Sequence, residues 1–99
     1  MPYIRPQYVT APKKRWMLHR VLIPGSAGKP AYALGTWDGG RCIAARWNGT
    51  DKNKIGWPRI YVRPCWYILD EQLCDAVLAL LPKYTERILA MRFLDGENV

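Results

Sequence analysis

Residues 31–47 have the sequence AYALGTWDGGRCIAARW, in which two largely apolar runs, 31–37 and 40–47, flank the dipeptide Asp38-Gly39. Asp-Gly readily adopts the positive φ angles that a two-residue type I′ turn requires. The apolar runs on both sides supply the two strands that such a turn joins. The stretch therefore predicts an antiparallel β-hairpin in which Trp37 pairs with Gly40.

This register divides the side chains of the hairpin between two faces, because successive residues of a strand point in opposite directions. One face carries Tyr32, Leu34, Ile43, Ala45 and Trp47, with Leu34 opposite Ile43 and Tyr32 opposite Ala45. The other face carries the smaller Ala33, Gly35, Cys42 and Ala44, which let another element approach closely. We expect a helix on the small face. The reverse arrangement stays open, because both faces are apolar.

The segment before the hairpin predicts a strand preceded by an arm. Residues 16–23 are rich in strand-favouring and long apolar residues and end at Pro24-Gly25-Ser26, which favours a strand, with a helix as the alternative. Residues 1–15 contain three prolines and end in Lys13-Lys14-Arg15, a composition typical of an extended tail or edge segment. We expect a basic arm over 1–15 and one domain over 16–99.

After the hairpin, the sequence predicts a loop over 48–56 and a β-rich segment over 57–69. Pro58 and Pro64 make that segment an edge strand, or two short strands meeting at a bend near Pro64, since proline cannot donate to a strand ladder. Asp70 can cap a helix with its apolar residues at Leu73, Val77, Leu80 and Leu81, ended or kinked by Pro82. A second helix is expected from Tyr84 or Thr85 to Leu94, closing near Gly96. The predicted fold is α+β: an antiparallel sheet of three to five strands with two C-terminal helices on one face.

Composition favours one small globular domain. The chain has 99 residues, of which 49% are hydrophobic and five are Trp, enough to form a core. It has no apolar run long enough for a membrane span and no signal-type segment, so we expect a cytoplasmic protein. Three cysteines without C-x-x-C spacing and a single histidine predict buried thiols in a reducing compartment, with no disulfide framework and no metal site.

The net charge of +7 is unevenly distributed along the chain. Residues 1–66 hold twelve Lys/Arg against two acids, which gives +10, whereas residues 67–99 hold three against six, which gives −3. Such an asymmetry predicts an acidic partner for the first part of the chain. Nucleic acid is the commonest partner of this kind, and an acidic protein is the next.

Cations alternate with aromatic residues in the basic part of the chain, at Arg15-Trp16, Arg46-Trp47, Trp57-Pro58-Arg59 and Tyr61-Val62-Arg63. Cations attract phosphates, and aromatic rings can stack on unpaired bases. The predicted binding residues are Lys13, Lys14, Arg15, Arg46, Trp47, Arg59, Tyr61 and Arg63. In the alternative interpretation the tryptophans belong to the core and the arginine stems cover them. The functional hypothesis is a non-enzymatic nucleic-acid-binding module, and its alternative is an adaptor that recognises an acidic protein.

No catalytic residue or cofactor is predicted. His19 has no second histidine and no acid close to it in the sequence, although a general base needs a positioned partner. Asp70, Glu71 and Asp75 are explained by capping and by the helix dipole. Phosphate-binding glycine motifs and a nucleophile elbow are absent from the sequence.

The last helix predicts an oligomer. Its apolar residues Ile88, Leu89, Met91 and Phe93 point along different sides of a helix that advances by about 100° per residue. A chain this short can hardly cover them all, so we expect a symmetric homodimer with this helix near the two-fold axis. A loosely packed helix with some exposed apolar residues is the alternative.

Four short segments carry a further pattern: Gly35-Thr36-Trp37-Asp38-Gly39, Arg46-Trp47-Asn48-Gly49, Gly56-Trp57-Pro58 and Pro64-Cys65-Trp66-Tyr67-Ile68-Leu69. Through these segments, over about residues 31–81, the chain resembles small uncharacterised bacterial proteins carried on mobile integron gene cassettes. The resemblance implies a bacterial cytoplasmic protein of unknown function and transfers no catalytic residue.

Overall fold

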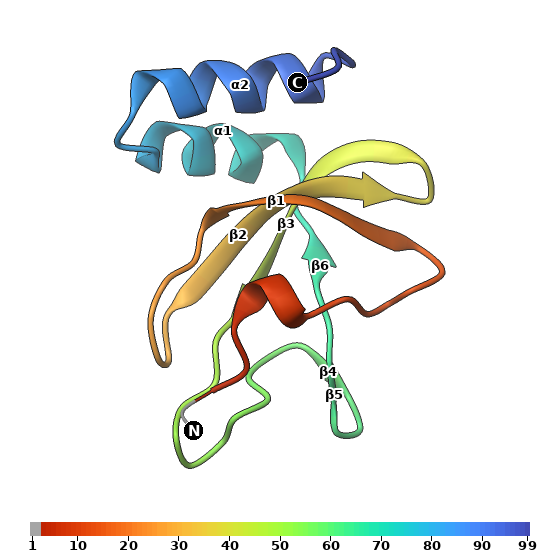
Figure 1. Ribbon diagram of the computed structural model, residues 1–99, viewed down its shortest axis with the longest axis vertical. Coiled ribbons are helices and arrows are strands. Elements are labelled where there is room, and N and C mark those ends of the chain that lie inside the picture. Colours follow the sequence, from red (N-terminus) through yellow and green to blue (C-terminus); the bar gives the residue numbers. More distant parts are fainter. Residues whose placement is uncertain (1–2) are drawn as a thin grey trace.

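The computed structural model describes residues 3–99 and has the predicted α+β architecture (Figure 1). A 3-10 helix, η1 (Pro6–Tyr8), precedes β1 (Trp16–Ile23), β2 (Pro30–Trp37) and β3 (Gly40–Trp47). Three two-residue strands follow: β4 (Arg59–Ile60), β5 (Arg63–Pro64) and β6 (Tyr67–Ile68). Helices α1 (Glu71–Leu80) and α2 (Tyr84–Leu94) complete the chain. The main sheet has the order β1-β2-β3-β6 with antiparallel pairs throughout, and β4-β5 form a separate pair.

The central hairpin has the predicted turn and register. Asp38 and Gly39 have φ angles of 52° and 85°, as a type I′ turn requires. Trp37 pairs with Gly40, Leu34 with Ile43 and Tyr32 with Ala45. The turn and the pattern of apolar residues thus specify this part of the sheet.

Both helices lie where the sequence predicts them. The Asp70 carboxylate accepts a hydrogen bond of 3.0 Å from the Leu73 amide, which caps α1, and the helix ends two residues before Pro82. After α2 the chain turns at Gly96, which has a φ of 96° and donates its amide to the carbonyl of Phe93.

The prediction that a helix packs on the small face of the hairpin is wrong, and the reverse arrangement holds. The helices cover the face with the larger side chains. The resulting helix-side core consists of Leu34, Ile43, Ala45, Leu69, Val77, Leu81, Ala90 and Phe93. Larger side chains fill the space that separates a helix layer from a sheet.

Tryptophans occupy the small face instead. We call this the tryptophan-side core; it contains Val9, Trp16, Ala31, Ala33, Cys42, Ala44 and Trp66. A Cβ atom on Gly35 would lie 2.4 Å from Cη2 of Trp16, so the absence of a side chain there makes room for the indole. The small residues of this face therefore accommodate indole rings and not a helix.

The N-terminal arm packs on the tryptophan-side core. Val9 is fully buried, and its carbonyl accepts a hydrogen bond of 2.6 Å from the Trp66 indole. Ala11 forms a parallel bridge with Cys65. Residues 3–15 are therefore part of the domain and not a free tail, while residues 1 and 2 of the predicted arm lie outside the described part of the chain.

The cysteines agree with the prediction of buried thiols. Cys42 and Cys65 are buried, Cys74 is half-buried, and all three are free. In the part of the chain that is described, neither helix is long and apolar enough to cross a membrane.

Candidate nucleic-acid interface

Between β3 and β6 the chain leaves the main sheet over residues 48–66, a segment that we call the excursion and that contains a protruding hairpin. Trp47 and Trp57 exchange two backbone hydrogen bonds of 2.7 and 3.0 Å, which close a loop over residues 48–56. Residues 58–64, which we call the finger, then form the β4-β5 hairpin at the end of the molecule opposite the helices (Figure 1). Its tip is Tyr61-Val62. The sequence predicted an edge strand, or two short strands meeting at a bend near Pro64. The two strands instead pair with each other and turn at Tyr61-Val62.

A buried arginine holds the two ends of this excursion. Arg46 is fully buried, and its guanidinium donates hydrogen bonds to the carbonyls of Cys65 at 2.5 Å, Trp47 at 3.3 Å and Pro58 at 3.5 Å, and also to the carbonyl of Ile55. Burial lowers the pKa of Arg46 to about 10, which leaves it protonated at neutral pH.

Arg46 must therefore be removed from the predicted binding residues. A guanidinium that is enclosed by protein carbonyls cannot contact a phosphate in solvent. Its role is to position the finger. Gly56 adds to this packing, because a Cβ there would lie 2.1 Å from the carbonyl oxygen of Trp47, and its φ is 72°.

Four aromatic residues share one face of the sheet beyond the helices. Tyr32 and Tyr67 both pair with Ala45, and Trp57 pairs with Trp47. Paired residues of an antiparallel ladder point to the same side, and Ala45 belongs to the helix-side core. We call Tyr32, Trp47, Trp57 and Tyr67 the aromatic platform.

The platform is accessible to a ligand. Trp47 is 49% exposed, Trp57 is 54% exposed and Tyr67 is 40% exposed, while Tyr32 is half-buried. The Arg59 guanidinium lies 4.7 Å from the ring centroid of Trp57, so that one face of this indole already carries a cation. The platform thus combines aromatic rings with positive charge.

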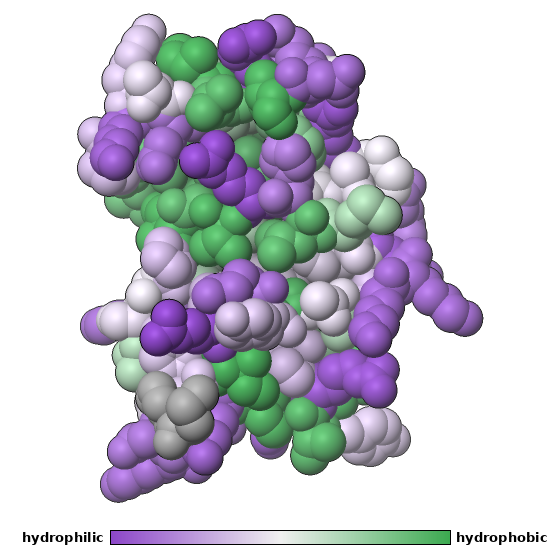
Figure 2. All heavy atoms as spheres, in the orientation of Figure 1, coloured by the Kyte–Doolittle hydropathy of each residue, from purple (hydrophilic) through white to green (hydrophobic). Residues whose placement is uncertain are grey.

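The finger adds two cations and an apolar tip. Arg59 and Arg63 are exposed, and neither forms an ion pair within residues 3–99. Tyr61 is 92% exposed at a φ of 55°, a region that non-glycine residues rarely occupy, so the backbone holds a bulky ring in solvent at some cost. Ile60 and Val62 are exposed as well, and Figure 2 shows hydrophobic side chains at the same end of the molecule.

The other predicted cations form a second group. Lys13 and Lys14 are exposed in the turn between η1 and β1, at the side of the molecule in Figure 1. Arg15 pairs with Asp38 at 3.1 Å, which ties this turn to the tip of the central hairpin. The structure therefore brings together Trp47, Arg59, Tyr61 and Arg63, and places Lys13, Lys14 and Arg15 apart from them.

Three residues of the platform, Tyr32, Trp57 and Tyr67, are missing from the predicted site. Trp57 precedes Arg59 in the cation and aromatic pattern, so a local signal for it existed. Tyr67 has none, because it joins the platform only through the pairing of β6 with β3.

Opposite charges gather at opposite ends of the molecule. Six of the eight acids, Asp70, Glu71, Asp75, Glu86, Asp95 and Glu97, belong to the helices and their flanking residues. The finger and the loop over 48–56 lie at the other end (Figure 1) and carry Arg59, Arg63, Lys52 and Lys54. The division of charge in the sequence thus becomes a division in space.

The predicted interface on α2 needs a correction. Phe93 is 4% exposed, its ring stacks on the imidazole of His19 with the centroids 4.4 Å apart, and the guanidinium of Arg41 lies 4.6 Å from its centroid. It is therefore part of the core. Ile88 and Leu89 are half-buried, and Met91 is 45% exposed. Of the four predicted residues, only Met91 is largely available to a partner.

Comparisons of the chain with protein-family models, with curated proteins and with solved structures find no match. The resemblance to integron-cassette proteins accordingly stays a prediction. Among residues 3–99, no group of three or more His, Cys, Asp or Glu side chains comes together in a way that could hold a metal ion. The functional proposal therefore depends on the geometry of the platform and the finger.

Proposed function

We propose that the protein binds single-stranded nucleic acid on the aromatic platform and the finger. The observation that supports this most is the sharing of one sheet face by Trp47, Trp57 and Tyr67. The Arg59 guanidinium lies over Trp57, Arg63 is exposed in the same finger, and neither arginine forms an ion pair within residues 3–99. Unpaired bases stack on exposed aromatic rings, and the phosphates between them need cations within reach.

A single strand fits this surface better than a duplex does. Stacking on a protein ring requires bases that are not already stacked in a helix. Within residues 3–99, α1 and α2 are unsuited to insertion into a major groove, because the helical layer carries most of the acids. Every base has an aromatic face, so we expect little base preference.

Binding should depend strongly on salt. Arg59 and Arg63 can neutralise two phosphates, and Lys52 and Lys54 in the neighbouring loop can add to them. For about three neutralised phosphates on a single strand, log K should fall with log salt with a slope of roughly −2.

The proposal is tested by fluorescence anisotropy with a labelled oligothymidylate at about 50 mM salt, where an electrostatic site binds well. Trp57→Ala should weaken binding by about 5- to 150-fold, which corresponds to roughly 1–3 kcal/mol for a lost stacking contact. Arg59→Ala and Arg63→Ala should weaken it and make the salt slope less steep.

Two exposed residues at the helical end provide matched controls. Tyr84 is 72% exposed and Lys83 is exposed, so Tyr84→Ala and Lys83→Ala remove one ring and one charge away from the platform. Both variants should bind like the wild type. Equal affinities of Trp57→Ala and Tyr84→Ala, or no binding by the wild type, would refute the proposal and favour the acidic protein partner.

A further inference from the structure

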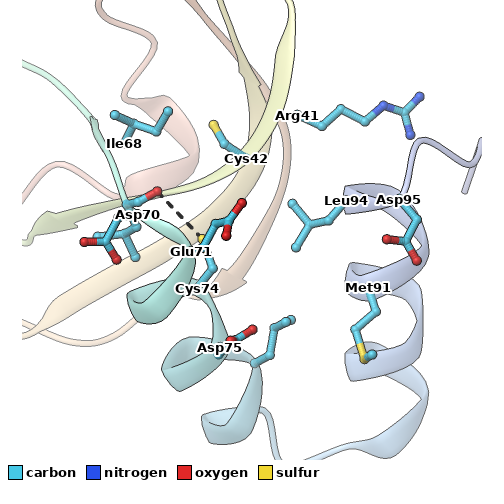
Figure 3. Close-up of a pocket in the computed structure, with 12 residues that line it drawn as sticks. Arg41, Cys42, Ile68, Asp70, Glu71, Cys74, Asp75, Met91, Leu94 and Asp95 are labelled. Carbon is cyan, nitrogen blue, oxygen red and sulfur yellow. Dashed lines mark hydrogen bonds between the residues drawn. The ribbon is translucent and has the colours of Figure 1, made fainter.

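A pocket with an acidic rim lies at the helical end of the molecule. It has a volume of about 660 Å³ and opens where α1 begins, where α2 ends and where β3 runs beyond β6. Figure 3 shows Cys42 and Ile68 on the sheet side of the pocket, and Leu94 pointing from α2 towards Glu71 and Cys74 on α1. Its volume is typical of binding pockets.

The pocket combines an apolar interior with a rim of four carboxylates. Ile68, Leu69, Leu78, Met91 and Leu94 supply the apolar surface. Asp70, Glu71, Asp75 and Asp95 surround it, all four are exposed, and none of them forms an ion pair within residues 3–99. The pocket therefore fits a partner with an apolar tip flanked by cations.

Among residues 3–99, Arg41 is the one cation that lines the pocket, and its guanidinium is already engaged. Arg41 donates hydrogen bonds to the carbonyls of Phe93 at 2.9 Å and Glu97 at 2.5 Å, at the C-terminal end of α2. It also lies over the ring of Phe93. Arg41 thus stabilises the end of the helix and leaves the four carboxylates without a counterion.

The finger of the same protein has the complementary chemistry. Ile60 and the tip residues Tyr61 and Val62 are 56%, 92% and 78% exposed, and Arg59 and Arg63 flank them in the sequence. The finger and the helices lie at opposite ends of the molecule (Figure 1), which prevents the finger from filling its own pocket. Apolar and electrostatic complementarity together favour a contact between copies.

We propose that the finger of one copy docks into the acidic pocket of a second copy, head to tail. Such a contact joins two different surfaces, so it adds copies to an open chain or a ring and does not stop at a symmetric pair. A hairpin of this size buries less than about 1,200 Å², which is typical of weak and transient association. The inference rests on the finger and the pocket and does not require that nucleic acid binds.

Sedimentation velocity across a concentration series tests this inference. At low salt and protein concentrations up to about 1 mM, the average mass should rise beyond twice the chain mass of 11.4 kDa. It should return towards the monomer at about 0.5 M salt, because exposed charges are then screened. A mass that stays at one chain over this range would overturn the inference.

Charge-reversal variants identify the two surfaces. Arg59→Glu with Arg63→Glu disables the finger, and Asp75→Lys with Asp95→Lys disables the pocket while leaving the Asp70 cap of α1 intact. Each double variant should be monomeric by itself. In a mixture, the intact finger of the pocket variant should dock into the intact pocket of the finger variant and form a 1:1 pair that grows no further.

Other outcomes of the mixing experiment would contradict the head-to-tail contact. If both double variants associate like the wild type, the contact is of another kind, such as the symmetric dimer through α2. If the mixture stays monomeric although both variants keep the wild-type circular dichroism, finger and pocket do not meet. Lys83→Glu and Glu86→Lys reverse charges outside both surfaces and should leave the association unchanged.

Oligonucleotide binding separates this inference from the proposed function. The pocket variant keeps its platform and finger and should bind oligothymidylate as the wild type does. If the protein both assembles and binds nucleic acid, the oligonucleotide should dissociate the assemblies, because assembly and oligonucleotide binding both use the finger. Assembly without oligonucleotide binding would refute the proposed function alone.

Discussion

Arg46 and Trp47 are neighbours in β3, yet they belong to two regions with opposite roles. Arg46 faces the tryptophan-side core and is fully buried. Its guanidinium donates a hydrogen bond to the carbonyl of Cys65, the residue before the buried Trp66. Trp47 faces the other way and is half exposed beside Trp57 and Arg59. Both regions use tryptophan and arginine. The alternation of the strand, and not the type of residue, determines which of them support the fold and which face a ligand.

The largest contrast is expected between Trp66 and Trp57. Trp66 is 2% exposed, donates a hydrogen bond to Val9 and has its ring centroid 5.8 Å from that of Trp16. Trp66→Ala should lower the free energy of unfolding by about 3–5 kcal/mol, as removal of a buried aromatic ring does. Trp57→Ala should change it by less than about 1 kcal/mol, because half of that ring is already in water. Urea denaturation measures both, and similar losses would erase the distinction between the regions.

Substitution of the buried Arg46 should likewise lower the free energy of unfolding more than substitution of the exposed Arg59. Arg46→Ala leaves several carbonyls of the excursion without their donor and should cost about 3 kcal/mol, since each unsatisfied buried group costs roughly 1–3 kcal/mol. Hydrogen exchange over residues 48–66 should accelerate, and oligonucleotide binding should weaken although no contact residue is changed. Arg59→Ala is the control: its stability should stay within about 0.5 kcal/mol of the wild type while its binding weakens. A stable Arg46→Ala variant with an ordered finger would contradict the role of Arg46.

A smaller contrast concerns two glycines of the central hairpin. Gly35→Ala places a Cβ 2.4 Å from both Cη2 of Trp16 and the carbonyl oxygen of Met17, and overpacking of this kind costs about 1–3 kcal/mol. At Gly40 the nearest atom, the carbonyl oxygen of Trp37, is 3.6 Å away, so Gly40→Ala should change stability by less than about 0.5 kcal/mol. Thermal denaturation of the two variants distinguishes them. Equal melting temperatures would show that the indole of Trp16 can shift without cost.

Local sequence signals predicted most of the fold. The Asp38-Gly39 turn and the cap at Asp70 each act within a few residues, and both appear in the structure. Helix α1 forms as predicted, but of its predicted apolar residues Val77 and Leu81 are buried, whereas Leu73 and Leu80 are exposed. The face on which the helices pack was predicted wrongly. Both faces are apolar, and a face with small side chains can accommodate either a helix or indole rings. The indoles of Trp16 and Trp66, which are distant in the sequence, determine the outcome.

The candidate site was predictable only in part. The pattern of cations and aromatics identified Trp47, Arg59, Tyr61 and Arg63. It could not exclude Arg46, whose burial depends on carbonyls up to 19 residues further along the chain. It also missed the joining of Tyr67 to the platform, which follows from strand pairing. Acids spread over α1 and the end of α2 gave no sign that they surround one pocket.

The smallest expected effect is a pH dependence of stability that arises from the thiol of Cys42. This residue lies near the start of β3, at the opposite end of the strand from Arg46 and Trp47. Burial, and secondarily the proximity of Cys74, raises the pKa of Cys42 from 9.0 to about 11. Above about pH 9 the unfolded chain therefore loses a thiol proton that the folded protein keeps, so the free energy of unfolding falls as the pH rises towards 11. The slope cannot exceed about 1.4 kcal/mol per pH unit for one thiol.

Urea denaturation between pH 8 and pH 10 should show a shallower decline of the free energy of unfolding for Cys42→Ala than for the wild type. If Cys42→Ala declines as steeply as the wild type, the tryptophan-side core does not hold this thiol in its protonated form, and the difference between the two faces of the sheet is one of packing alone.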